Sequence, residues 1–161
     1  MQEGYLFSGT IARNIAISDD EPDIERIRHA ARVANIADYI ETLPLAYNTM
    51  IGQDGQGISQ GQRQRILIAR VVYKNPMFVF LDEATNALDA NNERAITESL
   101  SDFYKGKTVV VVAHRLSTVR NADQIVVLDD GKIVEVGTHE ELTSKRGKYF
   151  ALVKNQLELG N

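Results

Sequence analysis

Two short, uninterrupted apolar runs constrain the fold of this chain more than any other feature of its sequence. Residues 77–81 read Met-Phe-Val-Phe-Leu, and residues 109–113 read Val-Val-Val-Val-Ala. Apolar runs of this length, without polar alternation, are typical of strands that are buried on both faces of a parallel sheet. Apolar residues at helical spacing surround both runs, so we predict an α/β fold with a parallel β core.

The segments around these runs predict the remaining elements. The turn residues Asp129-Asp130-Gly131 lie between two apolar stretches, residues 124–128 and 132–136, and predict a β-hairpin. Residues 5–17 are predicted as a loop that leads into a helical turn, and residues 48–61 as a glycine-rich loop. Helices are expected near residues 23–41, 59–73, 90–103, 138–144 and 147–158.

The composition is that of a globular domain, and it excludes several classes of site and partner. The 161 residues favour one domain. The net charge of −4 offers no general attraction to DNA or RNA, so no nucleic-acid partner is expected. The chain contains no cysteine, which excludes disulfides and thiolate metal sites. No apolar run approaches the length of a transmembrane helix.

The start of the second predicted helix has two compatible interpretations. Ser59 is followed three residues later by Gln62, which is the pattern of a capping box. The same turn could bind an anion, because a helix N-terminus carries unpaired amides and Gly61 lets a ligand approach the backbone. Arg63 and Arg65 add positive charge nearby. Ser59, Gly61 and Gln62 are therefore candidate phosphate-binding residues.

Two adjacent carboxylates, Asp82 and Glu83, follow the first apolar run. The carboxyl ends of parallel strands are where α/β sheets bind ligands. Asp82 is therefore a candidate Mg²⁺ ligand, and Glu83 a candidate proton acceptor from an attacking water. His114 follows the second run, so we expect it at the same end of the sheet. Each residue alone would more simply be solvated or structural, but their combination favours phosphate chemistry.

A serine hydrolase is the competing enzyme class. Residues 57–61 read Gly-Ile-Ser-Gln-Gly and match the G-x-S-x-G nucleophile elbow. Its partners would be Asp82 or Asp89 with His114 or His139, which follow in hydrolase order. The elbow needs a buried strand directly before its serine, whereas residues 51–57 are polar and rich in glycine. This interpretation is therefore disfavoured.

Taken together, these motifs resemble the nucleotide-binding domain of ATP-binding-cassette (ABC) transporters. Residues 58–62, Ile-Ser-Gln-Gly-Gln, resemble the LSGGQ signature of the family, and residues 78–83 resemble its Walker B strand with the catalytic glutamate. Ala87-Leu88-Asp89 resembles the D-loop, His114 the switch histidine, and Gln2 the Q-loop glutamine. The motifs occur in the order that the family has and cover nearly the whole chain.

The resemblance implies a partial P-loop NTPase (ABC ATPase) fold in a single partial domain, residues 1–161. A helical subdomain would occupy residues 10–75, approximately, and the C-terminal part of the catalytic core residues 76–161, including the hairpin and two helices. Residues 121–142 resemble the C-terminal part of exporters. Details of the signature and the D-loop look most like bacterial peptide or bacteriocin exporters.

ATP and Mg²⁺ are the cofactors that the resemblance implies. Gln2 would contact Mg²⁺ and the attacking water, and Asp82 would coordinate Mg²⁺. Glu83 would act as the general base. His114 would contact the γ-phosphate. The implied activity is ATP hydrolysis coupled to transport across a membrane.

The resemblance also implies partners. Ser59, Gly61 and Gln62 would contact the γ-phosphate of ATP held by a second nucleotide-binding domain, and Asp89 would connect the two sites. Residues 10–58 would receive the coupling helices of a transmembrane domain. The expected location is therefore the cytoplasmic face of a cell membrane.

One motif of the family is missing from this sequence. A P-loop requires G-x-x-x-x-G-K-[ST], and neither Gly4 with Gly9 nor Gly52 with Gly57 is followed by Lys-Ser/Thr. The resemblance therefore covers the C-terminal portion of the domain. We expect the chain alone to bind ATP weakly and to hydrolyse it negligibly. We also expect self-association to cover an exposed sheet edge or apolar face.

Two further functions stay open at this point. The first is a non-hydrolytic module that donates a signature motif to a partner or serves in dimerisation. The second is a chromosome-maintenance ATPase, a class that shares these motifs but acts on DNA, which the net charge does not support. Gln60 and Ile58 depart from the signature consensus, and a glutamine at a turn that faces phosphate could obstruct it or add a hydrogen bond.

Overall fold

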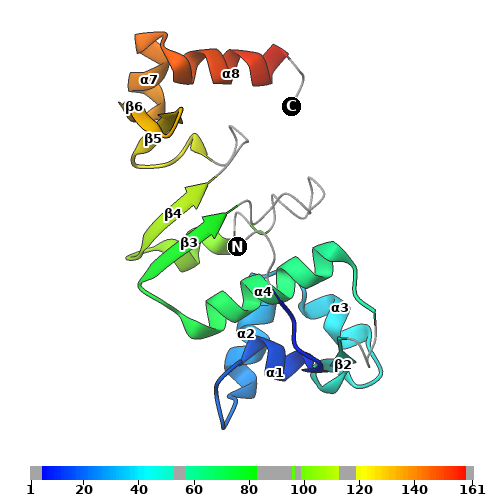
Figure 1. Ribbon diagram of the computed structural model, residues 1–161. Helices are drawn as coiled ribbons and strands as arrows, with labels where there is room; N and C mark the ends of the chain where they lie inside the picture. The colour runs from blue at the N-terminus through cyan, green and yellow to red at the C-terminus, as the bar shows by residue number, and fades with distance from the viewer. Residues whose placement is uncertain (1–4, 53–56, 83–95, 97–98, 113–118, 159–161) are drawn as a thin grey trace. The chain divides into compact units, whose positions relative to one another are not determined.

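The computed structural model describes residues 5–52, 57–82, 96, 99–112 and 119–158 (Figure 1). Its contacts divide the chain into two compact units, residues 1–110 and 111–161. The two units have separate hydrophobic cores. This boundary reflects contacts within the chain, whereas the subdomain boundary predicted near residue 75 follows the family pattern. The boundary near residue 75 therefore stays a prediction.

The first unit is mainly helical, and α4 is its longest described helix. The helices are α1 (Ile11–Ile15), α2 (Ile24–Val33), α3 (Ala37–Thr42), the 3-10 helix η1 (Ala46–Asn48) and α4 (Gln60–Lys74). Both α1 and α2 pack against α4. They do so because Ile66, Ala69 and Tyr73 recur at helical spacing on one buried face of α4. The predicted helix at residues 59–73 is confirmed.

The single helix predicted at residues 23–41 is wrong, because the chain forms α2 and α3 with a break between them. Asn35 has a φ of 51°, in the left-handed region. The amide of Asn35 donates to Arg32 O (3.0 Å), and the amide of Ile36 donates to Ala31 O (3.0 Å). This pair of bonds is a Schellman motif, with buried Ile36 as its apolar contact. Asparagine tolerates the left-handed conformation better than most residues, which explains why the helix ends here.

A small antiparallel ribbon lies where the sequence predicts only loops. It pairs β1 (Gly9–Thr10) with β2 (Met50–Ile51), and Gly9 is opposite Ile51. Strands of two residues are too short to show an alternating pattern, so the sequence carries no periodic signal for them. Gly52 ends the ribbon with a φ of 110°, and a Cβ atom there would lie 2.8 Å from Ser8 Cα. The close approach of the two segments therefore requires a glycine.

Strands β3 (Phe78–Asp82) and β4 (Thr108–Val112) pair with each other and run in the same direction (Figure 1). The amide of Thr108 donates to Met77 O at 3.0 Å, at the start of both strands. The predicted parallel core is present, with residues 96 and 99–104 helical between the strands. Burial on both faces is not observed over the described residues. Val79 is 3% exposed, whereas Phe78 and Phe80 are 68% and 73% exposed.

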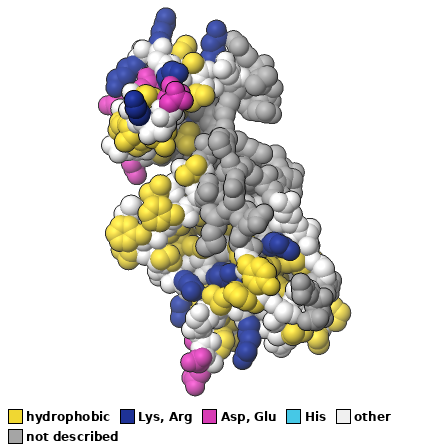
Figure 2. Space-filling model, viewed as in Figure 1, with side chains coloured by type: hydrophobic (Ala, Val, Ile, Leu, Met, Phe, Trp, Pro, Cys, Tyr) yellow, Lys and Arg dark blue, Asp and Glu magenta, His cyan; other side chains and the backbone are white. Residues whose placement is uncertain are grey.

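The exposed aromatic face of β3 is part of the hydrophobic surface that Figure 2 shows over β3 and β4. Phe78 and Phe80 alternate with buried Val79, so both rings lie on the same side of the strand. Val110 of β4 is also exposed (42%). The second face of this sheet is therefore apolar but has no cover among the described residues.

The second unit contains the predicted hairpin and both predicted helices. Strands β5 (Ile125–Asp129) and β6 (Lys132–Gly137) pair antiparallel, followed by α7 (His139–Lys145) and α8 (Lys148–Glu158). The turn residues Asp130 and Gly131 have φ values of 48° and 71°. Two successive positive φ values are typical of a type I′ turn, which the Asp-Gly pair favours. These sequence predictions are confirmed.

Packing in the second unit joins the hairpin to α8. The buried residues Ile125, Val127, Leu142, Tyr149 and Val153 form its core. The carboxylate of Glu135, on β6, accepts a hydrogen bond from the amide of Tyr149 (2.7 Å) in the first turn of α8. Glu135 thus satisfies an amide that has no partner within the helix.

Candidate functional site

The candidate phosphate site is the first turn of α4, and a capping box holds it. Ser59 is the N-cap residue, and its Oγ accepts a hydrogen bond from the amide of Gln62 at 3.2 Å. The Oε1 atom of Gln62 accepts one from the amide of Ser59 at 2.8 Å. The capping interpretation of Ser59 and Gln62 is therefore confirmed. Both bonds fix the direction in which the helix N-terminus points.

The groups left over at this turn are hydrogen-bond donors. The amides of Gln60 and Gly61 precede the first intrahelical bond, which Arg63 N makes to Ser59 O (2.9 Å). The Ser59 hydroxyl has accepted a bond, and its hydrogen has no acceptor among the described residues. Ser59 is exposed and Gly61 is half-buried, so a ligand can reach the turn. Free donors at a helix N-terminus fit the oxygens of a phosphate group.

The geometry of Ser59 contradicts the serine hydrolase alternative. A nucleophile elbow places its serine in a strained turn directly after a strand. Ser59 has a φ of −67° and a ψ of 161°, which is ordinary extended backbone, and residues 57–59 form no strand. The Nδ1 atom of His139 lies 2.9 Å from Tyr149 Oη and is engaged within the second unit. Ser59 is thus a helix cap whose hydroxyl hydrogen has no acceptor in the part of the chain that the structure describes.

The acidic part of the predicted site begins at the end of β3, as expected from the sequence. Asp82 is the last residue of that strand. Gln2, Glu83, Asp89 and His114 lie outside the described residues, so their predicted roles stay predictions. Within the described ranges, no cluster of three or more acidic or histidine side chains could hold a metal ion.

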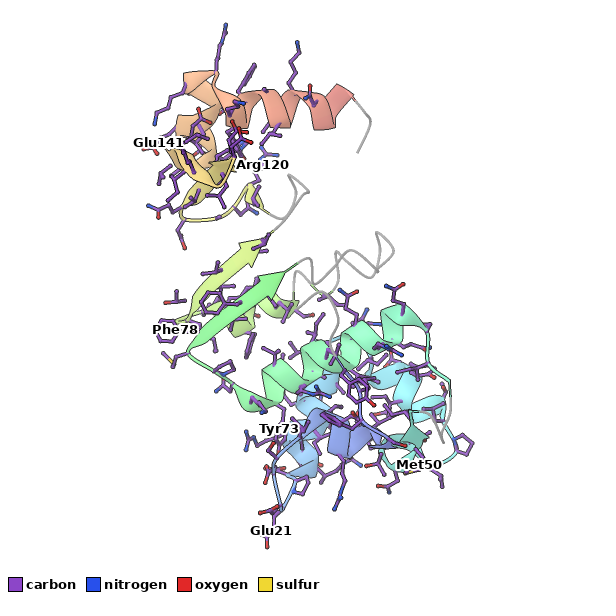
Figure 3. The ribbon with its side chains drawn as sticks, in the orientation of Figure 1. Glu21, Met50, Tyr73, Phe78, Arg120 and Glu141 are labelled. Atoms are coloured by element: carbon purple, nitrogen blue, oxygen red, sulfur yellow. The ribbon has the colours of Figure 1, made fainter. Side chains whose placement is uncertain are left out.

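A second candidate feature, which the sequence did not reveal, is a groove beside α1. It has a volume of about 680 Å³. We call it the α1 groove, and it is lined by Phe7, Ser8, Gly9, Thr10, Arg13, Asn14, Ile17 and Met50. Met50 is labelled in Figure 3. The groove was missed because the β1–β2 ribbon brings together residues that are 40 positions apart. One local feature of the sequence pointed to this region. Thr10 is the N-cap residue of α1, and its Oγ1 accepts a hydrogen bond from Arg13 N at 3.1 Å.

Asn14 forms part of the wall of the α1 groove and organises the loop in front of it. Its side chain is 1% exposed. Its Oδ1 accepts from the amide of Phe7 (2.9 Å), and its Nδ2 donates to Phe7 O (2.9 Å) and Thr10 O (3.1 Å). The amide group thus satisfies backbone groups of two loop residues, which keeps the groove wall in one conformation.

Arg70 ties this wall to α4. Its Nε donates to Asn14 O (2.8 Å), its Nη1 to Tyr5 O (3.1 Å) and its Nη2 to Asn14 Oδ1 (3.4 Å). Partial burial lowers the pKa of the Arg70 guanidinium, but arginine remains charged because its pKa starts so high. One side chain therefore bonds both the N-terminal loop and α1.

The described part of the chain contains no helix that is both long and apolar enough to cross a membrane.

The profile of the ABC transporter family matches residues 2–86, which are more than half of the chain. The chain belongs to the ABC transporter family. The matched segment includes the Ser59 turn, α4, β3 and the α1 groove. The predicted α/β fold class, a partial P-loop NTPase fold, is confirmed with it.

The sequences of relatives align with nearly the whole chain. ABC transporter B family member 14 of Arabidopsis thaliana is 47% identical over 155 residues, 96% of this chain and 12% of the relative. The ATP-dependent lipid A-core flippase of Saccharophagus degradans is 48% identical over 155 residues, 96% of this chain and 26% of the relative. The solved structure of a bacterial Atm1-family ABC exporter with ATP bound is 39% identical, with a TM-score of 0.89. That match covers 96% of this chain and 27% of the exporter.

These comparisons confirm the resemblance to ABC exporters at the level of the family. The chain spans between 12% and 27% of the length of the three relatives described above. The match covers only one part of each relative, so it does not show what this chain helps to transport.

Proposed function

We propose that this chain is the C-terminal part of the nucleotide-binding domain of an ABC exporter, where it takes part in binding and hydrolysing ATP to drive transport. The observation that carries the proposal is the Ser59 turn. It presents the Ser59 hydroxyl and the amides of Gln60 and Gly61 at the start of a 15-residue helix. All these groups are donors, so the turn suits the γ-phosphate of ATP held by a second nucleotide-binding domain.

The remaining roles rest on the family pattern. Asp82 and Gln2 would hold Mg²⁺, which neutralises phosphate charge during hydrolysis. Glu83 would accept a proton from the attacking water, and His114 would donate a hydrogen bond to the γ-phosphate. Asp89 would join the two nucleotide sites across the dimer. The sequence of this chain contains no P-loop pattern, so we propose that the chain alone hydrolyses ATP negligibly.

The direct test is ATP hydrolysis by the assembled transporter that contains this chain. We expect hydrolysis that requires Mg²⁺ and a second nucleotide-binding domain. Absence of hydrolysis in the assembled protein, with ATP binding intact, would contradict the proposal. Turnover by the isolated chain that Glu83→Gln abolishes would refute the expected inactivity of the chain alone.

We further propose a bacterial peptide or bacteriocin exporter as the subclass. The support is confined to the sequence details of residues 57–62 and 87–93. The relatives described above include a lipid A-core flippase, whose name indicates a different cargo. Transport assays with a peptide and with a lipid substrate would separate the two classes.

The α1 groove is the proposed contact surface for a transmembrane domain at the cytoplasmic face of the membrane. Phe7, Ile17 and Met50 give the groove an apolar lining, and Phe7 and Met50 are 49% and 47% exposed. Arg13 is the charged residue among those that line it. Among the described residues, the Arg13 guanidinium has no ion-pair partner. A short apolar helix that carries a carboxylate would match this lining.

Arg13→Glu is expected to weaken this contact at least about tenfold, because like charges placed opposite each other at an interface cost several kcal/mol. The measurement is the amount of transmembrane domain that co-purifies with the variant, together with transport. Arg120→Glu is the matched control, because Arg120 is an exposed arginine outside the groove and outside residues 10–58. Equal loss in both variants would show that the effect is one of overall charge.

Self-association of the isolated chain is a further proposal. The exposed side of β3 carries Phe78 and Phe80, with Val110 on the paired strand (Phe78 is labelled in Figure 3). Aromatic rings exposed to this degree favour burial against another apolar surface. We expect dimers or larger species in sedimentation experiments at micromolar concentration. We also expect Phe78→Ser with Phe80→Ser to return the chain to a monomer, whereas a monomeric parent chain would refute the idea.

A further inference from the structure

Arg70 bridges two features that the proposed function uses separately, the α1 groove and the helix that begins at Ser59. Its guanidinium reaches Asn14 O at 2.8 Å and Tyr5 O at 3.1 Å. Both acceptors are backbone carbonyls, one in α1 and one in the loop before β1. Planar arginine can hold two carbonyls at a fixed separation, which the point charge of lysine cannot do.

A single side chain, Leu6, anchors the loop that Arg70 holds in the core of the first unit. Tyr5 and Phe7 are 65% and 49% exposed, and Leu6 between them is 8% exposed. Polar bonds therefore supply much of the support for this segment, from Asn14 to Phe7 and from Arg70 to Tyr5. A segment with few buried contacts opens at low free energy, so its position depends on these bonds.

The helix on which Arg70 lies is held along its length. Near the start of α4, Arg65 Nη1 donates to Asn35 O at 2.9 Å. Near its end, Arg26 Nη2 donates to Tyr73 O at 2.8 Å. An α-helix of 15 residues is roughly 22 Å long and moves nearly as one body when it is packed in this way. A displacement of the groove wall would therefore either break the Arg70 bonds or move the Ser59 end of α4.

We propose that Arg70 is a positioning residue that transmits occupancy of the α1 groove to the Ser59 turn. The inference rests on the proposed function, because it presumes that the groove binds a transmembrane partner and that the turn contacts ATP. When the groove wall moves, the Asn14 and Tyr5 carbonyls pull on the guanidinium, and α4 follows. Arg70 is not among the residues that line the groove, and it lies outside the Ser59 turn.

The test is Arg70→Lys in the assembled transporter, with ATP hydrolysis measured with and without an added peptide, the cargo class proposed above. We expect basal hydrolysis to stay within about twofold and the cargo-dependent stimulation to fall about fivefold or more, the usual range of coupling between sites. Lysine keeps the charge but loses the two-carbonyl geometry. Arg32→Lys, at an exposed position on α2, is the matched control and should retain full stimulation. Thermal unfolding of both variants should remain at the parent temperature.

Each outcome has a separate meaning. Normal basal hydrolysis with full stimulation in Arg70→Lys would overturn this inference and leave the proposed function intact. Absence of hydrolysis in the unmodified transporter would overturn the proposed function and this inference with it. Equal loss of basal and stimulated hydrolysis would show a purely structural role and also overturn the inference.

A second measurement decides the question if Arg70→Lys does not assemble. Amide hydrogen exchange is followed in the unmodified transporter on adding ATP. Protection of residues 5–10 and of residues 60–65 should change together, because Arg70 joins the loop to α4. A change in one segment alone would overturn the inference.

Discussion

Glu83→Gln is expected to lower ATP hydrolysis by the assembled transporter about 10²- to 10⁴-fold, the usual contribution of a general base. Glutamine has nearly the same shape as glutamate, but it cannot accept the proton of the attacking water. Asp82 and the Ser59 turn are unchanged in this variant, so ATP binding should be retained. The measurement is steady-state phosphate release, with nucleotide binding determined in parallel.

Glu21→Gln controls for the loss of one negative charge, because Glu21 is an exposed acid in the loop before α2 (Figure 3). Its hydrolysis should equal that of the parent. Hydrolysis that is unchanged by Glu83→Gln would favour the alternative in which this chain donates its signature motif without hydrolytic work. Loss of ATP binding in Glu83→Gln would place the residue in binding instead.

The features that the sequence predicted correctly are those that local chemistry determines. The capping box needs Ser59 and Gln62 three residues apart, and the hairpin needs Asp130-Gly131 between two apolar stretches. In both cases the partners lie within a few residues of each other. Intrinsic turn and cap preferences therefore act without help from the rest of the fold.

The break between α2 and α3 shows where such local evidence fails. Apolar residues continue at helical spacing through Ala34, so periodicity predicted one helix. The chain instead turns at Asn35, whose carbonyl accepts a hydrogen bond from Arg65 of α4. The donor of this bond lies 30 residues further along the chain, so the local sequence around Asn35 does not report it. Asn35 itself was the available signal, because asparagine is a frequent C-terminal residue in the left-handed conformation.

The α1 groove was missed, and the exposed apolar face was expected without being assigned to β3, for a related reason. The groove joins Phe7 to Met50 through a ribbon of two-residue strands, and pairings so short leave no periodic pattern. The run from Met77 to Leu81 predicted a strand correctly, but an apolar pattern cannot report whether both faces are covered. Phe80 is 73% exposed although its sequence context is that of a buried strand.

Ser59→Asp is expected to separate the two functions of Ser59 and to abolish most ATP hydrolysis. Aspartate is as good a helix cap as serine, so the bond to Gln62 N and the stability of α4 should be retained. A carboxylate at this turn would face the γ-phosphate. Repulsion between unit charges about 4 Å apart is about 4 kcal/mol at an effective dielectric constant of about 20. Hydrolysis should therefore fall about 10²- to 10³-fold, with an unchanged unfolding temperature.

Two control variants identify charge as the cause. Ser59→Asn keeps a strong cap without a charge, so it should retain far more hydrolysis than Ser59→Asp. Thr138→Asp places a carboxylate in the second capping box of the chain, where Thr138 Oγ1 accepts from Glu141 N at 3.3 Å. This variant shows whether an acidic cap lowers the unfolding temperature at a helix with no proposed phosphate contact. ATP hydrolysis by the Thr138→Asp variant should match that of the parent. If Ser59→Asp unfolds at a lower temperature or hydrolyses ATP as fast as the parent, Ser59 acts as a cap alone. The donors at this turn would then have no part in binding ATP.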